Sequence, residues 1–287
     1  MNIQTKSALF YKILVLFILA QGLGVFLASK ISPIIALEST RNLSDFSFGQ
    51  FLFLAAFLII FSILIARMPR FSSILLKLFL ILIVFLMTQM VLSLWLNTFN
   101  STLMALALTI VFLIYRSVFI HDLLMIIAFA GVGAVVGVTL QPLAVVYLLI
   151  IFSFYDIVAV YKTGQMVKLA DAMIRSRAIF GFIIPQKFGG FFSNLRTAEP
   201  GEDFMILGSG DVILPLLLSA SIAGQSIPKA LIIAACSVLG VLATSILFMS
   251  QKNKPLTQGA KVARRPMAAL PPIAALTIIG YLITRFF

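Results

Sequence analysis

The chain has 287 residues, of which 62% are hydrophobic and only 10% are charged. Soluble domains are roughly 45–50% apolar and about 25% charged, so the composition excludes an ordinary soluble protein and indicates lipid as the solvent. The net charge of +12 would suggest nucleic acid in a soluble protein. Here the basic residues lie between apolar stretches, where membrane topology and anionic lipid explain them, so we expect no nucleic-acid partner.

Cysteine and histidine are almost missing from the sequence. Its one cysteine, Cys236, lies inside an apolar stretch, so an internal disulfide is excluded. Its one histidine, His121, has no nearby set of partners for a metal site. We expect neither a metal nor a cofactor.

Apolar runs predict an all-α, polytopic membrane protein with nine transmembrane helices in a single domain, residues 1–287. A membrane helix needs about 20 predominantly apolar residues. Spans five and six are separated only by Gln141 and Pro142, and a proline there favours a break. The predicted spans are residues 9–29, 49–67, 72–96, 101–118, 122–141, 143–162, 204–222, 227–250 and 266–286.

The distribution of Lys and Arg predicts the direction of the chain, because short cytoplasmic loops carry an excess of these residues. With a cytoplasmic N-terminus, the outer side holds few of the 21 basic residues, namely Lys30, Arg41, Lys229 and Arg285. We therefore predict a multi-pass protein of the cell membrane, with its N-terminus in the cytoplasm and its C-terminus outside.

One long connection, residues 163–203, joins spans six and seven on the predicted cytoplasmic side. Long loops in compact proteins are usually functional or disordered. The apolar segment 178–184 within it is too short to cross a membrane. We expect this segment either to lie on the membrane or to plug a cleft between helices.

Small and polar residues inside the spans are expected to serve helix packing. Gly131, Gly133 and Gly137 in span five let neighbouring helices approach closely. Gln21 in span one and Gln89 in span three are predicted to make hydrogen bonds between helices.

Two acidic residues, Asp156 and Asp211, lie well inside predicted spans. A carboxylate there costs roughly 2.5–3.5 kcal/mol on insertion scales, so each is a functional candidate. Asp156 lies roughly 9 Å along a helix from Lys162, at the end of span six. Asp211 lies roughly 10 Å from Phe204, at the start of span seven. Because these spans are antiparallel neighbours, we expect the two carboxyl groups to face each other at one level.

A pair of carboxyl groups suits peptide hydrolysis. Two such groups a few ångströms apart cannot both ionise cheaply, so one keeps a proton. The ionised member then takes a proton from water, while the neutral member donates one to the scissile carbonyl oxygen. The alternative is a proton- or cation-coupled transporter or channel that uses the same pair. Transporters usually show repeated halves with broken helices, and the sequence shows no internal repeat.

The neighbours of Asp211 fit this chemistry. Gly208-Ser209-Gly210-Asp211 places glycines one and three residues before the carboxylate, where small residues permit close helix approach. Pro215 lies four residues after Asp211 and has no N–H, so the Asp211 carbonyl loses its helical donor. We expect a loosened helix where water must enter.

The motifs around both carboxylates resemble those of a known family. Tyr155 and Asp156 in span six, and the Gly-Ser-Gly-Asp run at 208–211 in span seven, resemble the YD and GxGD motifs of presenilins and signal peptide peptidases. The resemblance covers the whole nine-span plan. The predicted direction is that of presenilins, and the compact loops are similar to those of the small archaeal presenilin homologues.

The third motif of that family, Pro-Ala-Leu, falls at the start of the last span. It matches Ala268-Ala269-Leu270, with alanine in the place of the family's proline, and Pro271 follows. The resemblance implies that this segment shapes the substrate cleft and engages the substrate backbone.

The resemblance further implies an intramembrane aspartyl endopeptidase with Asp156 and Asp211 as its catalytic pair. Its substrates would be transmembrane proteins, surrounded like the enzyme by membrane lipid, and a homo-oligomer is left open. A substrate helix must unwind, because a helical backbone hides its carbonyl groups. An unwound strand is expected to pair with an edge just before span seven or near Leu270.

Overall fold

The long apolar runs fold as helices in the computed structural model, which describes residues 3–38, 69–115, 117–164, 173, 176, 178–185, 188–192, 204–250 and 268–286. In these residues, eight of the predicted spans overlap a helix, and the span predicted for 49–67 lies outside them. The helices are α1 (Ile3–Glu38), α3 (Pro69–Ser93), α4 (Thr98–Ile114), α5 (Val118–Thr139), α6 (Pro142–Ile157), α8 (Ser209–Ala223), α9 (Ile227–Ser250) and α10 (Leu270–Phe286).

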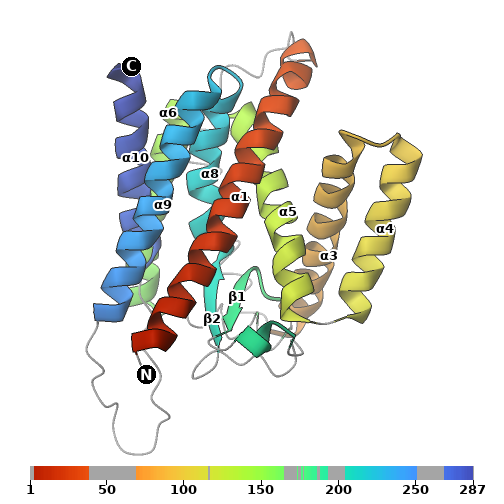
Figure 1. The fold of residues 1–287 in the computed structure, drawn as a ribbon, viewed down its shortest axis with the longest axis horizontal. Helices are drawn as coiled ribbons and strands as arrows, with labels where there is room; N and C mark the ends of the chain where they lie inside the picture. The colour runs from red at the N-terminus through yellow and green to blue at the C-terminus, as the bar shows by residue number, and fades with distance from the viewer. Residues whose placement is uncertain are drawn as a thin grey trace, which may run out of the picture.

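Several of the described helices are long and apolar enough to cross a membrane. Helices α4, α8 and α10 are apolar but shorter. The two ends of the chain lie at opposite ends of the bundle (Figure 1). The five stretches of sufficient length are Leu9–Ile35, Ile74–Ser93, Val118–Thr139, Pro142–Lys162 and Ile227–Leu247.

Helix α6 begins where the sequence predicts a break. Gln141 is its N-cap and Pro142 its first residue, a position that tolerates proline because that N–H has no helical partner in any case. The α-helical part ends at Ile157, and the chain continues as a π-helix, η1 (Val158–Lys162). Such π turns are frequent at functional sites.

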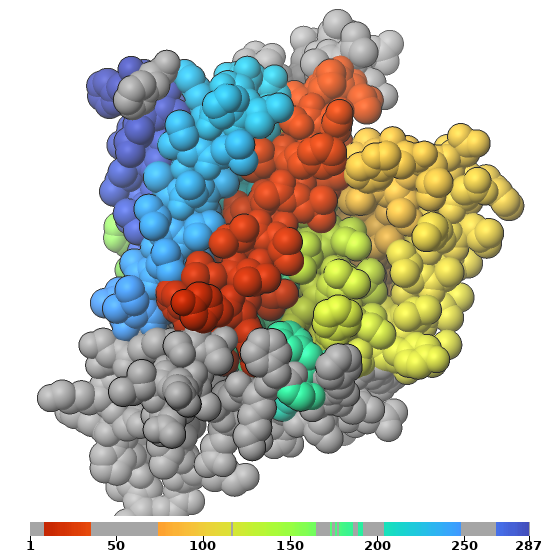
Figure 2. All heavy atoms as spheres, in the orientation of Figure 1, coloured from red at the N-terminus to blue at the C-terminus, as the bar shows by residue number. Residues whose placement is uncertain are grey.

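Helix α8 lies at the centre of the bundle. It packs against α1, α5, α6, α9 and α10. Helix α1 crosses the visible face between α9 and α5 and covers α8 from that side (Figures 1 and 2). Helices α3 and α4 form a hairpin at one side, where the amide of Gln89 donates to Thr102 Oγ1 (3.1 Å), as predicted for that glutamine.

The structure is mostly helical, but the expectation of an all-α protein is wrong at one end of the bundle. A two-stranded antiparallel sheet forms there from β1 (Gly181–Pro185) and β2 (Phe204–Gly208). Residues 204–208 were predicted as the first part of span seven, whereas α8 begins at Ser209. A short apolar run fits a strand as well as a helix, and pairing with β1 decides between them. Ser209 N also donates to Phe180 O (3.1 Å) and extends the pairing to the start of α8.

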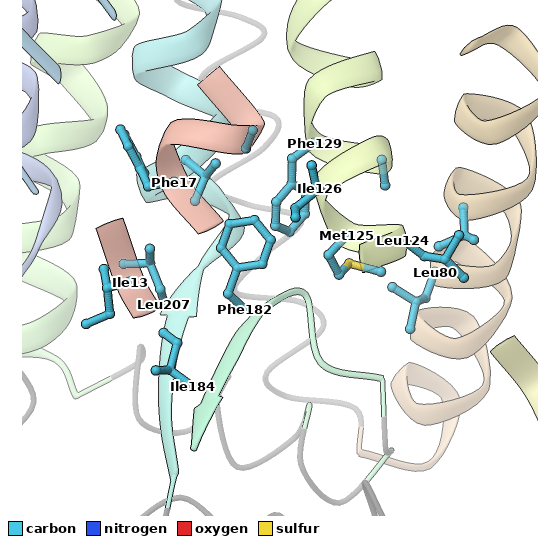
Figure 3. Packing of buried hydrophobic residues seen from close by; sticks show 14 of the residues in the cluster. Ile13, Phe17, Leu80, Leu124, Met125, Ile126, Phe129, Phe182, Ile184 and Leu207 are labelled. Atoms are coloured by element: carbon cyan, nitrogen blue, oxygen red, sulfur yellow. The ribbon is translucent and has the colours of Figure 1, made fainter. Parts of the chain in front are cut away.

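The segment predicted to lie on the membrane or plug a cleft instead contains β1, which is buried along its whole length. Phe182 and Ile184 point into a cluster with Phe17 of α1 and Phe129 of α5 (Figure 3). The rings of Phe129 and Phe182 meet edge to face, with centroids 5.2 Å apart. This packing fixes the sheet against α1 and α5.

The glycines of α5 serve helix packing, as predicted. A Cβ atom at Gly131 would lie 3.0 Å from the Met87 side chain of α3. One at Gly137 would lie 2.9 Å from the Leu217 backbone oxygen of α8. Helix α8 therefore approaches α5 more closely than any larger residue would allow.

Gly137→Ala is expected to destabilise the protein by about 1–3 kcal/mol, because the new methyl group meets backbone that cannot move away cheaply. The same change at Gly22 of α1, where no described atom lies within 4 Å of the added Cβ, serves as the control. Thermal unfolding in detergent measures both. Equal midpoints for the two variants would contradict the close contact between α5 and α8.

Candidate active site

Asp156 lies in the last turn of α6 with its side chain only 7% exposed. Its Oδ2 accepts a hydrogen bond from the backbone N–H of Leu270 (3.2 Å), the first residue of α10. The first N–H groups of a helix have no partner within the helix and carry partial positive charge, so they suit a carboxylate. Tyr155 beside it is partly buried.

Asp211 lies in the first turn of α8 and is 8% exposed. Gly208, three residues earlier, ends β2 and is the N-cap of α8, with extended backbone angles (φ −64°, ψ 150°). A Cβ atom there would lie 3.4 Å from Asp211 Oδ2. The strand therefore delivers the carboxylate directly to the end of the sheet.

The two carboxyl groups occupy one region of the structure. Helices α6 and α8 pack against each other, and Asp156 is close enough to Asp211 to act on it electrostatically. Both side chains are buried. The structure thus places near each other the two acidic residues that the sequence singled out.

The depth estimate for Asp211 was wrong. It assumed a helix from Phe204, but residues 204–208 are extended, and a strand rises about 3.3 Å per residue rather than 1.5 Å. Asp211 is only the third residue of α8. The strand, rather than a helical turn count, sets the level of this carboxylate.

The packing role predicted for Gly208 and Gly210 is also wrong. No described atom lies within 4 Å of a Cβ built at Gly210, and the nearest at Gly208 belongs to Asp211 itself. Neither glycine mediates a close helix contact, because both stand at the strand-to-helix junction rather than inside a helix pair.

Pro215 interrupts the backbone hydrogen bonding of α8. It is buried inside the helix and offers no N–H to the Asp211 carbonyl. One residue on, the Val212 carbonyl accepts a hydrogen bond from Gln21 Nε2 of α1 (3.0 Å). The expectation that Gln21 bonds between helices is confirmed, and its partner is the backbone next to Asp211.

The predicted cleft segment Ala268-Ala269-Leu270 lies against Asp156. Ala268 and Leu270 are buried, and the Ala269 carbonyl accepts from Thr244 Oγ1 of α9 (3.3 Å). Pro271 is the second residue of α10, where a missing N–H costs nothing. The sequence gives no reason to single out Thr244, because threonines inside apolar helices usually bond only to their own backbone.

Helix α9 fixes the start of α10 at Gly240. A Cβ there would lie 2.6 Å from Ile273 Cα and 3.3 Å from the Pro272 oxygen. The close approach leaves no space for a side chain. The backbone around Leu270 is therefore held in place from α9.

Three further polar side chains contact β1 and were not assigned to a site from the sequence. They are Lys12 of α1 and His121 and Asp122 of α5, all of them buried. Asp122 lies at the start of a predicted span, where an acidic residue is common, and the sequence suggested His121 only as a possible metal ligand. Adjacent polar residues at the edge of an apolar run were the one available signal.

Gly240→Ala is expected to displace the start of α10 and to weaken the Leu270–Asp156 hydrogen bond. Amide hydrogen exchange at Leu270 should become faster. Gly280→Ala is the control, because a Cβ there would meet Cys236 Cβ at 2.7 Å, in the same helix pair but away from Leu270. Faster exchange at Leu270 in both variants would show that Gly240 has no special place in this contact.

Comparison with known proteins agrees with this architecture. The family model described as signal-peptide peptidase, presenilin aspartyl protease matches residues 13–287. A search of curated proteins gave no match. Two solved structures of a presenilin family intramembrane aspartate protease, in P2 and C222 crystal forms, are similar in fold. The first has 21% identity and a TM-score of 0.62 over 95% of this chain and 96% of that one. The second has 19% identity and a TM-score of 0.64 over 96% and 98%.

The family match spans nearly the whole chain and includes Asp156, Asp211 and the segment Ala268-Ala269-Leu270. The apolar helices agree with a multi-pass membrane protein. The chain therefore belongs to the signal peptide peptidase and presenilin family of intramembrane aspartyl proteases.

Proposed function

We propose that Asp156 and Asp211 are the catalytic pair of this protease, and that the chain hydrolyses peptide bonds in transmembrane helices of membrane proteins. The observation that carries the proposal is the burial of both carboxyl groups on two packed helices, within electrostatic reach of each other. An uncompensated buried charge is costly, so one shared proton between the two is the favourable state.

The proposed reaction needs only these two groups and a water molecule. The ionised carboxylate takes a proton from the water, whose oxygen attacks the scissile carbonyl carbon. The neutral carboxyl gives its proton to the carbonyl oxygen, which forms a tetrahedral diol. Collapse of the diol breaks the C–N bond, and a proton passes to the leaving nitrogen. The products are a new carboxyl group and a new amine.

The register of the sheet indicates where an unwound substrate would bind. The Ser209–Phe180 bond marks a hydrogen-bonded pair, and hydrogen-bonded and non-hydrogen-bonded pairs alternate along an antiparallel ladder. Ile183 and Ile206 are therefore a non-hydrogen-bonded pair, whose N–H and C=O groups point away from the partner strand. Among the described residues, nothing bonds to the backbone of Ile206.

In the part of the chain that the structure describes, Ile206 on the outer edge of β2 is therefore available for strand addition, a common way of binding extended peptides. A substrate strand paired there would run beside the chain that leads through Gly208 to Asp211. We propose that Ala268, Ala269, Leu270 and Pro271 also contact the bound substrate, because the Leu270 amide bonds to Asp156.

Asp156→Asn and Asp211→Asn are each expected to lower the cleavage rate by about 10²–10⁴-fold or more, because an amide neither takes nor gives the required proton. The assay follows cleavage of a labelled single-span peptide in lipid nanodiscs by mass spectrometry. Gln89→Leu, which removes the α3–α4 hydrogen bond, is the control and should keep the wild-type rate. Undiminished cleavage by either asparagine variant would remove that residue from the mechanism.

Ile206→Pro tests the strand edge separately. Its N–H faces away from β1, so proline there keeps the sheet but removes a donor to the substrate. We expect KM to rise about tenfold from loss of a backbone hydrogen bond in a buried cleft. Ile206→Val, which keeps the N–H, should behave as wild type. Equal KM values for the two variants would show that the substrate does not pair with β2.

A further inference from the structure

The outer edge of β1 is closed by side chains at each outward-facing residue. His121 Nε2 donates to the Gly181 carbonyl (3.1 Å). The Ile183 N–H donates to Asp122 Oδ1 (2.8 Å). The third bond, from Lys12 Nζ to the Pro185 carbonyl, is 2.7 Å long.

These contacts alternate with the bonds to β2, as the register requires. Gly181, Ile183 and Pro185 are the residues whose polar groups point away from β2. Each of these three residues makes a backbone hydrogen bond with one buried side chain. Two of the side chains come from α5 and one comes from α1. The two edges of the sheet therefore differ: side chains occupy the outer edge of β1, whereas the backbone of Ile206 on β2 has no partner among the described residues.

Burial makes these bonds strong and costly to lose. Lys12, His121 and Asp122 are only 6%, 2% and 1% exposed. A buried polar group that loses its partner carries the full desolvation penalty. Lys12 also lies over the Phe191 ring, 5.3 Å from its centroid, which is a favourable place for a cation.

Asp122 is held to the strand by one contact. Its second oxygen, Oδ2, is buried and has no hydrogen-bond partner in the described part of the chain. The bond from Ile183 N–H to Oδ1 is therefore the interaction that a substitution at this position would test most directly.

We infer that Lys12, His121 and Asp122 form an edge clamp, which closes β1 to strand pairing and so directs an incoming substrate strand to β2. This inference rests on the proposed function. The three are positioning residues: they touch the sheet rather than the substrate. Strands pair about 4.8 Å apart, so a substrate on β1 would lie farther from the chain leading to Asp211 than one on β2.

The test compares Asp122→Leu, which removes the acceptor, with Asp122→Asn, which keeps an oxygen for the Ile183 N–H. Amide exchange at Ile183 is measured without substrate, and cleavage of the single-span peptide is measured in nanodiscs. For Asp122→Leu we expect exchange at Ile183 to accelerate about tenfold or more. We also expect KM to rise about tenfold with kcat changed less than about threefold, because strand pairing binds ground state and transition state alike.

Asp122→Asn should restore the wild-type exchange rate at Ile183 and the wild-type KM, and Gln89→Leu should leave both unchanged. If Asp122→Leu does not fold, Lys12→Met and its conservative partner Lys12→Arg are compared instead, with KM and kcat as readouts, because Lys12 bonds to the Pro185 carbonyl. A purely structural role would lower the unfolding midpoint without separating KM from kcat.

Unchanged exchange at Ile183 in Asp122→Leu would overturn the clamp, and so would faster exchange with an unchanged KM. An inactive wild-type protein, or full activity in Asp211→Asn, would instead overturn the proposed function. Because exchange is read without substrate and KM only with it, the two failures are distinguishable.

Discussion

Every backbone N–H and C=O group that is removed from water must find a partner inside the protein, and this constraint shapes the whole structure. Helices meet it by themselves. In the described residues the chain departs from self-sufficient helices at the sheet, at Pro215 and at the start of α10. At β1 and at the start of α10 a buried side chain supplies a partner, and near Pro215 a buried side chain bonds to the Val212 carbonyl. The edge clamp serves β1, Gln21 serves the backbone beside Asp211, and Asp156 accepts from Leu270.

The places where the chain is not a regular α-helix lie around the two buried carboxyl groups. A protease inside a membrane needs an extended substrate and water, and a bundle of unbroken helices offers neither. The strand-to-helix junction at Gly208 brings Asp211 to the end of a sheet, and the π turn begins two residues after Asp156. The site is therefore assembled from α6, from the β2–α8 junction and from the start of α10. The close packing of α8 against α1 and α5 and of α10 against α9 holds these parts together.

The sequence was informative where a strong physical signal acts locally. A carboxylate in lipid is so costly that Asp156 and Asp211 are recognisable as functional candidates from the sequence alone. The apolar runs predict helices because a helix makes all its backbone hydrogen bonds within one segment. It failed at residues 204–208, because five apolar residues fit a strand or a helix equally well. Because residues 204–208 were predicted as helix, the predicted depth of Asp211 was wrong, and so was the helix-packing role predicted for Gly208 and Gly210.

By itself the sequence determined a family of membrane-embedded aspartyl proteases, the overlap of eight spans with helices in the described residues, and the two acidic residues of the proposed site. Only the tertiary structure decided that β1 and β2 pair, that Leu270 meets Asp156, and that Lys12, His121 and Asp122 close one edge of the sheet. The reason is physical. Burial cost and helix formation depend on residues near in sequence, whereas these contacts join segments up to 173 residues apart and exist only once the helices have packed.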